Sequence, residues 1–189
     1  MAVAVNIFSF YLGWFACVLA AARDLPWVGT AVALLLITLH LWRRAWPAPE
    51  LRLILLSGVV GLALDSLPVA LGLVDYPSGT VVVNFAPYWI VALWMLFATT
   101  LNSSLRWLQG RPLLAALLGA VAGPLAYYSG AQLGGMALLE PLPALLVLAL
   151  GWSLALPLLL SWITRGDGTA ETDRQNAGHG GSARAEKPA

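Results

Sequence analysis

Long apolar segments alternate with short polar ones along this chain, and that pattern predicts its elements. A helix that crosses a membrane needs about 20 predominantly apolar residues. Six segments meet or approach that length, namely residues 5–22, 25–42, 51–73, 87–108, 112–134 and 141–163. We therefore predict an all-α fold, a polytopic bundle of six transmembrane helices that forms one domain over residues 1–164.

The positive charges predict how this bundle is oriented. Loops on the cytoplasmic side of a membrane are enriched in Lys and Arg. In a six-span arrangement nine of the ten positive charges fall on one side, and only Arg23 falls on the other. Both termini are therefore expected in the cytoplasm. Residues 165–189 are polar, rich in Gly and free of aromatic residues, so we predict a disordered cytoplasmic tail there.

Composition supports the membrane class and limits the partners. Only 10% of the 189 residues are charged, against about 25% in soluble domains. The net charge of +1 provides no field that would attract nucleic acid. Cys17 is the one cysteine of the chain, so an intrachain disulfide is excluded. Membrane lipids are the expected partners, and a further membrane protein is an additional candidate.

One carboxylate falls in the middle of a predicted span. Asp65 shares a three-four spacing with small residues and Pro, which places it on a close-packed helix face. These neighbours are Gly58, Gly61, Pro68 and Gly72. A carboxylate at that depth costs about 2.5 to 3.5 kcal/mol. Asp65 is then either a proton, cation or substrate site, which we favour, or a packing residue bonded to Tyr127 or Tyr128 at the same depth.

A second polar group follows the fourth span, in the stretch "FATTLNSSLRWL" at residues 97–108. Its hydroxyls can bond back to helix carbonyls, and Arg106 can extend to the headgroups. The Asn102 amide needs a partner, and helix rise places His40 and Asn6 near its level. The candidate substrate-binding or proton-site residues are Asp65, Tyr127, Tyr128, Asn102, His40, Asn6 and Arg106.

Trp14, Trp94 and Trp152 fall in mid-span, unlike the tryptophans near span ends. They supply packing volume, which we favour, or they line a site for a lipophilic ligand. A stripe of small residues in the fifth span, including Gly119 and Gly123, predicts a helix-contact face.

Several chemistries find no support. The sequence has no GxxxxGK[ST] loop, no GxSxG elbow and no HExxH motif. Its two histidines cannot form a three-His zinc site. We therefore expect no metal and no cofactor, the catalytic residues are unknown, and the chain is not predicted to be an enzyme.

Four stretches carry a family resemblance. They are "VNIFSFYLGW", "LALDSLPVALGL", "APYWIVALWMLFATTLNSSLRWL" and "GPLAYYSGAQLG". With these, residues 5 to 160 resemble a family of bacterial inner-membrane proteins catalogued as a domain of unknown function. The resemblance implies a multi-pass protein of the bacterial inner membrane and supplies no activity.

Our leading hypothesis is that the bundle binds, transports or presents a lipid or lipophilic small molecule. Two polar clusters in a chain with almost no extramembrane mass motivate it. The first alternative is a non-catalytic accessory subunit of a membrane complex, whose small-residue stripes serve assembly. The second is a proton-coupled transporter that uses Asp65.

Overall fold

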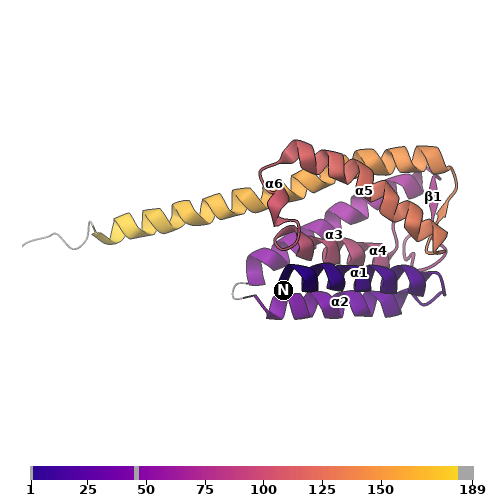
Figure 1. Cartoon of the computed structure of the whole chain (residues 1–189), viewed down its shortest axis with the longest axis horizontal. Helices are drawn as coiled ribbons and strands as arrows, with labels where there is room; N and C mark the ends of the chain where they lie inside the picture. The colour runs from indigo at the N-terminus through magenta and orange to yellow at the C-terminus, as the bar shows by residue number, and fades with distance from the viewer. Residues whose placement is uncertain (1, 45–46, 183–189) are drawn as a thin grey trace, which may run out of the picture.

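A computed structural model describes residues 2–44 and 47–182, with side-chain surroundings over 3–44 and 47–163. The all-α prediction is confirmed, since helices form almost all of its regular structure (Figure 1). They are α1 (Ala2–Ala21), α2 (Pro26–Trp42), α3 (Pro47–Ala70), α4 (Tyr88–Leu101), η1 (Arg106–Leu108), α5 (Pro112–Gln132) and α6 (Pro141–Ser182). Two short strands, β1 (Val74–Asp75) and β2 (Ala137–Leu138), complete the described elements.

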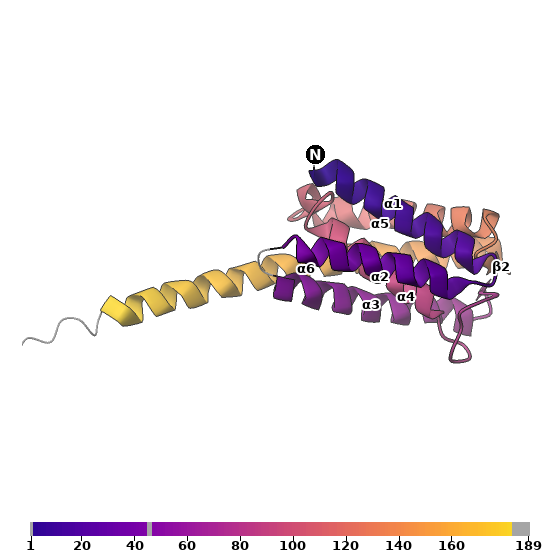
Figure 2. The same ribbon diagram turned by 90° about the horizontal axis from the view of Figure 1, so that it is seen from below.

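Proline marks where several helices begin. Helices α2, α3, α5 and α6 each start at a Pro, which fits because the first turn of a helix leaves its N–H groups unpaired and Pro has none. The link between α1 and α2 is short, and Asp24 in it adopts the left-handed conformation with φ of 58°. The first two helices therefore form a tight antiparallel hairpin (Figure 2).

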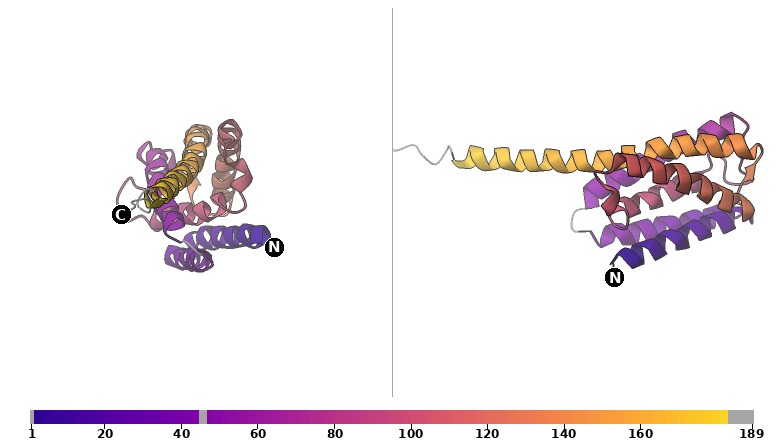
Figure 3. Two further views of the ribbon diagram at one scale, coloured as in Figure 1. Left: turned by 90° about the vertical axis from the view of Figure 1, so that its left-hand side faces the viewer. Right: turned by 45° about the horizontal axis from the view of Figure 1, so that its top comes forward.

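Helix α4 lies at the centre of the bundle. It packs against α1, α2 and α3, and nine of its 14 residues are buried. Helix α5 packs mainly against α6, while α1 packs mainly against α2 and α4. The view along the bundle shows the α1–α2 pair and the α5–α6 pair on different sides of α4 (Figure 3).

Glycines admit two large indoles between these helices. A Cβ on Gly61 would lie within the Trp94 side chain, and a Cβ on Gly123 would meet the Trp152 ring. The two indoles stack on each other with centroids 4.2 Å apart and planes at 20°. Gly61, Trp94, Trp152 and Gly123 thus form a stack from α3 through α4 and α6 to α5, and the small-residue faces predicted for the third and fifth spans are both helix contacts.

Four of the six predicted spans match helices that are long and apolar enough to cross a membrane. These are Val3–Ala21, Pro47–Ala70, Pro112–Gln132 and Pro141–Ile163. Helices α2 and α4 are apolar but shorter. The prediction for residues 87–108 placed the helix end wrongly, since α4 stops at Leu101 and turns and η1 follow.

The two ends of the bundle differ. At one end β1 pairs antiparallel with β2, with Val74 opposite Leu138, which ties the α3–α4 connection to the α5–α6 connection. The start of α1 lies at the other end, from which the last part of α6 projects (Figure 1). The backbone of α6 is helical to Ser182, and residues 183–189 lie outside the described residues, so the disordered tail stays a prediction.

Candidate functional site

Asp65 is completely buried and has hydrogen-bond donors from three parts of the chain. Trp94 on α4 donates its indole N–H to Oδ2 over 2.5 Å. Tyr76, in the α3–α4 connection, donates its hydroxyl to Oδ1 over 3.4 Å. Tyr127 on α5 also hydrogen bonds to this carboxyl group. The carboxylate therefore joins α3, α4, α5 and the connection after α3.

The structure brings Tyr127, but not Tyr128, to Asp65. Tyr127 is buried, whereas Tyr128 is 48% exposed and faces a different side of α5. Tyr76 was not among the sequence candidates because it lies outside the predicted spans. Burial raises the pKa of the Tyr76 hydroxyl well above its usual value, and the nearby Asp65 carboxylate raises it further. The Tyr76 hydroxyl therefore stays protonated and remains a donor.

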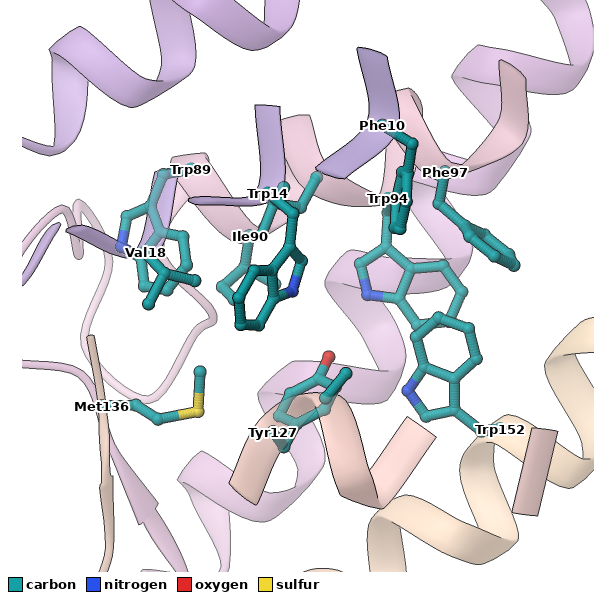
Figure 4. A pocket seen from close by; sticks show the side chains of 12 residues that line it. Phe10, Trp14, Val18, Trp89, Ile90, Trp94, Phe97, Tyr127, Met136 and Trp152 are labelled. Carbon is teal, nitrogen blue, oxygen red and sulfur yellow. The ribbon is translucent and has the colours of Figure 1, made fainter. Parts of the chain in front are cut away.

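An aromatic cavity lies beside this group. Its empty volume, including the part open to the surroundings, is about 490 Å³, and all three mid-span tryptophans line it together with Phe10, Phe97 and Tyr127. Figure 4 shows the indole nitrogens of Trp94 and Trp152 and the hydroxyl of Tyr127 turned toward the middle of the ring of side chains. The mid-span tryptophans thus supply packing and line a space at once.

A wider groove opens from this cavity between α1 and α5, with part of α6 as its floor. Its empty volume, including the open mouth, is about 1810 Å³. The residues that line both spaces are Phe10, Trp14, Phe97, Ala126 and Trp152. Leu125 and Tyr128 at its edge are exposed. The cavity is therefore reached from the side of the bundle, in the direction where lipid would surround a membrane protein.

Trp152 has a buried polar atom that needs a partner. Its Nε1 is buried and has no hydrogen-bond acceptor among the described residues. By contrast, Trp89 donates to the Ser78 carbonyl over 3.1 Å, and Trp94 donates to Asp65. A buried donor without an acceptor costs about 1 to 3 kcal/mol, and such groups call for an explanation. The free N–H lies where cavity and groove meet, so a bound molecule could supply the acceptor.

A second network lies at the other end of α3, around Glu50. His40 Nε2 lies 2.9 Å from Oε1, and the Asn102 amide donates to Oε2 over 2.9 Å. Arg44 adds an ion pair at 3.6 Å. His40 and Asn102 are thus joined through a carboxylate that the sequence analysis missed, because the third span was started at residue 51. An acidic residue one position before a span was the available signal.

The contact with Glu50 shows that the Nε2 nitrogen of His40 carries a proton. An unprotonated Nε2 would turn its lone pair toward the carboxylate, which repels it, so Nε2 carries a proton and donates to Glu50. The contact of Arg44 with the same nitrogen, at 3.3 Å, is then no hydrogen bond. Arg44 instead donates to the Ser103 hydroxyl over 2.9 Å.

Side-chain amides bind the last backbone carbonyls of α4. Asn6 donates to the Thr99 carbonyl over 3.2 Å, and Gln109 donates to the Leu101 carbonyl over 3.2 Å. Asn6 Oδ1 also accepts from the Ser104 hydroxyl over 2.8 Å, and Gln109 donates to the side-chain Oδ1 of Asn102 over 3.0 Å. The last carbonyls of a helix lack partners within it. The polar side chains after Phe97 thus belong to the network that binds the end of α4, and the helix ends before the predicted residue 108.

Arg106 does not join either network. It lies exposed at the start of η1, and the structure records no polar contact from its side chain within residues 3–44 and 47–163. In that same part of the chain no three His, Cys, Asp or Glu side chains gather closely enough to hold a metal ion. The candidate site of this structure is therefore the cavity and its groove, with Asp65 behind it.

Comparison with known proteins adds a family. Residues 3–158 match the model of a family described as a protein of unknown function, DUF2878. No curated protein and no solved structure matches the chain.

Proposed function

Since the chain belongs to the DUF2878 family, whose description states no activity, we propose its function from its own geometry. It is an integral membrane protein that binds a lipid or lipophilic small molecule between α1 and α5, to move it or present it for modification. The aromatic cavity is the inner part of the binding site, and the groove is the route to it.

The main support for this proposal is the unpaired indole N–H of Trp152, which lies where the cavity and the groove meet. The other buried polar groups named above have partners in the protein, which makes this donor the exception. Ligand sites are typically concave and mostly apolar with a few polar groups that orient the ligand. An apolar groove with one free donor at its inner end has that character.

Six spans are part of the proposal, although α2 and α4 are short. Helix α4 has 14 residues, which gives about 21 Å against a hydrocarbon thickness of about 30 Å. A non-helical backbone is tolerated at membrane depth where protein covers it. Helix α4 is central, and the amides of Asn6 and Gln109 bind its last carbonyls. A short α4 can therefore complete a span inside the bundle.

The proposed orientation places both termini in the cytoplasm, with the protein in the bacterial inner membrane. Six antiparallel helices put the start of α1 and the far end of α6 at the same end of the bundle. Arg44 and Arg106 belong to that end, and Arg23 belongs to the opposite one, which agrees with the preference of Lys and Arg for the cytoplasmic side.

Lipid retention by the purified protein tests the binding site. Ala126 lines both cavity and groove, so Ala126→Phe would fill the space where they meet. Val121→Phe is the matched control, because Val121 is 60% exposed on the same helix and lines neither space. After purification in mild detergent, bound lipid is extracted and identified by mass spectrometry.

We expect the unaltered protein and Val121→Phe to retain the same lipophilic molecule, and Ala126→Phe to lose most of it. Equal retention by all three proteins, or no retained molecule in any, would refute the proposed site. A stoichiometric protein partner in place of a lipid would favour the accessory-subunit alternative.

A further inference from the structure

Resting on the proposed function, we propose that the ligand is an uncharged long-chain lipid whose head carries a hydrogen-bond-accepting oxygen, and that the Trp152 indole N–H binds this oxygen. Such an oxygen belongs to a ketone, ester, ether, alcohol or quinone. Three observations support this ligand. The uncharged lining of the two spaces indicates that the ligand has no charge. The unpaired donor indicates an acceptor in its head group, and the apolar groove indicates a long apolar chain.

No Lys, Arg, His, Asp or Glu side chain lines the cavity or the groove within the described residues. A phosphate or carboxylate head would therefore enter without a counter-ion, and an unpaired buried ion costs several kcal/mol. The carboxyl group of Asp65 lies just behind Trp94 and would repel an anion further. This arrangement disfavours anionic lipids as occupants of the inner cavity.

A cationic head is the other charged possibility, because aromatic rings attract cations over their faces. Trp94 and Trp152 each turn one face to the other, so those two faces are closed to a cation. The Asp65 carboxyl already accepts from Trp94 and Tyr76. A cation would also leave the Trp152 N–H without an acceptor. An uncharged oxygen is the head group that completes the site.

The groove fits an extended apolar chain. Aliphatic and aromatic side chains dominate its walls, among them Phe15, Leu118 and Leu156. Its polar side chains, such as Tyr128 and Gln132 on α5 and Tyr11 on α1, carry no charge. With the head at Trp152, a chain can run along α5 and α1 and leave the bundle sideways. The lipid would then enter from the bilayer rather than from water.

Brominated probes of one chain length test the head group. The set comprises a long-chain ketone, the matching alkane, an alkyl sulfonate and an alkyl trimethylammonium, each with bromine on the chain to quench tryptophan fluorescence. Each is titrated into detergent-solubilised protein, into Ala126→Phe and into two further variants. Trp152→Phe keeps a stacking ring and removes the N–H, while Trp162→Phe removes an exposed indole from the same helix as a control.

We expect the ketone to bind about five- to tenfold more tightly than the alkane, the gain expected from one hydrogen bond of about 1 kcal/mol. Trp152→Phe should abolish that difference, and Trp162→Phe should preserve it. Both charged probes should bind more weakly than the ketone. Tighter binding of a charged probe, or a ketone preference that survives Trp152→Phe, would overturn this inference and leave the proposed function standing. If no probe quenches more strongly than it does in Ala126→Phe, the proposed function fails as well.

Discussion

At the scale of single residues, Asp65 shows what a sequence can and cannot predict. Its position on a close-packed face could be predicted from its spacing to Gly58 and Gly61. The helix rise per residue also predicted that Tyr127 lies at the same depth. The hydrogen bond from Trp94 could not be predicted, because it depends on the side-chain conformation of Trp94, for which Gly61 leaves room. Tyr76 could not be found either, since the fold of the α3–α4 connection brings it there.

The Asp65 bonds predict a graded loss of stability. Asp65→Leu removes the acceptor of Trp94, Tyr76 and Tyr127, and a buried donor without an acceptor costs about 1 to 3 kcal/mol. Asp65→Asn keeps one acceptor oxygen, so its loss should be smaller, about 1 kcal/mol. Thermal unfolding in detergent measures both. Asp75→Asn is the control, because Asp75 is exposed and its unfolding midpoint should not move. A midpoint for Asp65→Leu equal to that of the unaltered protein would show that these bonds do not hold the helices together.

At the scale of elements, helix α4 is where the sequence prediction was least accurate. The predicted span ran to residue 108, because a sequence pattern does not show where side-chain amides, in place of backbone N–H groups, bind the last carbonyls of a helix. Asn6 lies more than 90 positions from Thr99, so only the tertiary fold shows that it caps α4. The small-residue faces of the third and fifth spans were predictable, because close packing needs small residues whatever the partner is.

Gly61 and Gly151 have different surroundings, so alanine at these two positions should have different effects on stability. A Cβ on Gly61 would overlap the Trp94 ring, whereas a Cβ on Gly151 would meet only Leu64 at 3.5 Å. Gly61→Ala should therefore destabilise the protein by about 1 to 3 kcal/mol, as overpacking does. Gly151→Ala should be neutral or stabilising by up to about 1 kcal/mol. Unfolding midpoints in one detergent compare the pair, and similar midpoints for both would argue against the stack of indoles between α3 and α5.

At the scale of the whole molecule, composition was enough to predict apolar helices in a bundle. The groove was not predictable, because it depends on two helices, α1 and α5, that each pack mainly against other partners. The Trp152 donor was likewise hidden, since a sequence does not show which polar atoms lack a partner. The mid-span tryptophans were the one signal for a lipophilic site, and packing was the more economical interpretation.

The six-span topology predicts which segments a membrane-impermeant thiol reagent can reach. In a Cys17→Ala background, Val82→Cys in the α3–α4 connection should react in intact cells, because the proposed topology places that connection outside the cytoplasm. Thr169→Cys, beyond the last candidate span, should react only after the membrane is permeabilised. The topology puts three spans, α4, α5 and α6, between the two positions. Labelling at both positions in intact cells would mean that an even number of spans separates them, and would contradict this topology.

Crosslinking inside the groove shows whether a specific lipid lies between α1 and α5. A small diazirine analogue of phenylalanine replaces Phe97, which lines both cavity and groove, and is activated in living cells. The control replaces Leu113, which is 81% exposed on α5 and lines neither space. We predict that position 97 captures a narrow set of uncharged lipids, while position 113 captures the mixture of the surrounding bilayer. No lipid adduct at position 97, or the same mixture at both positions, would contradict the account.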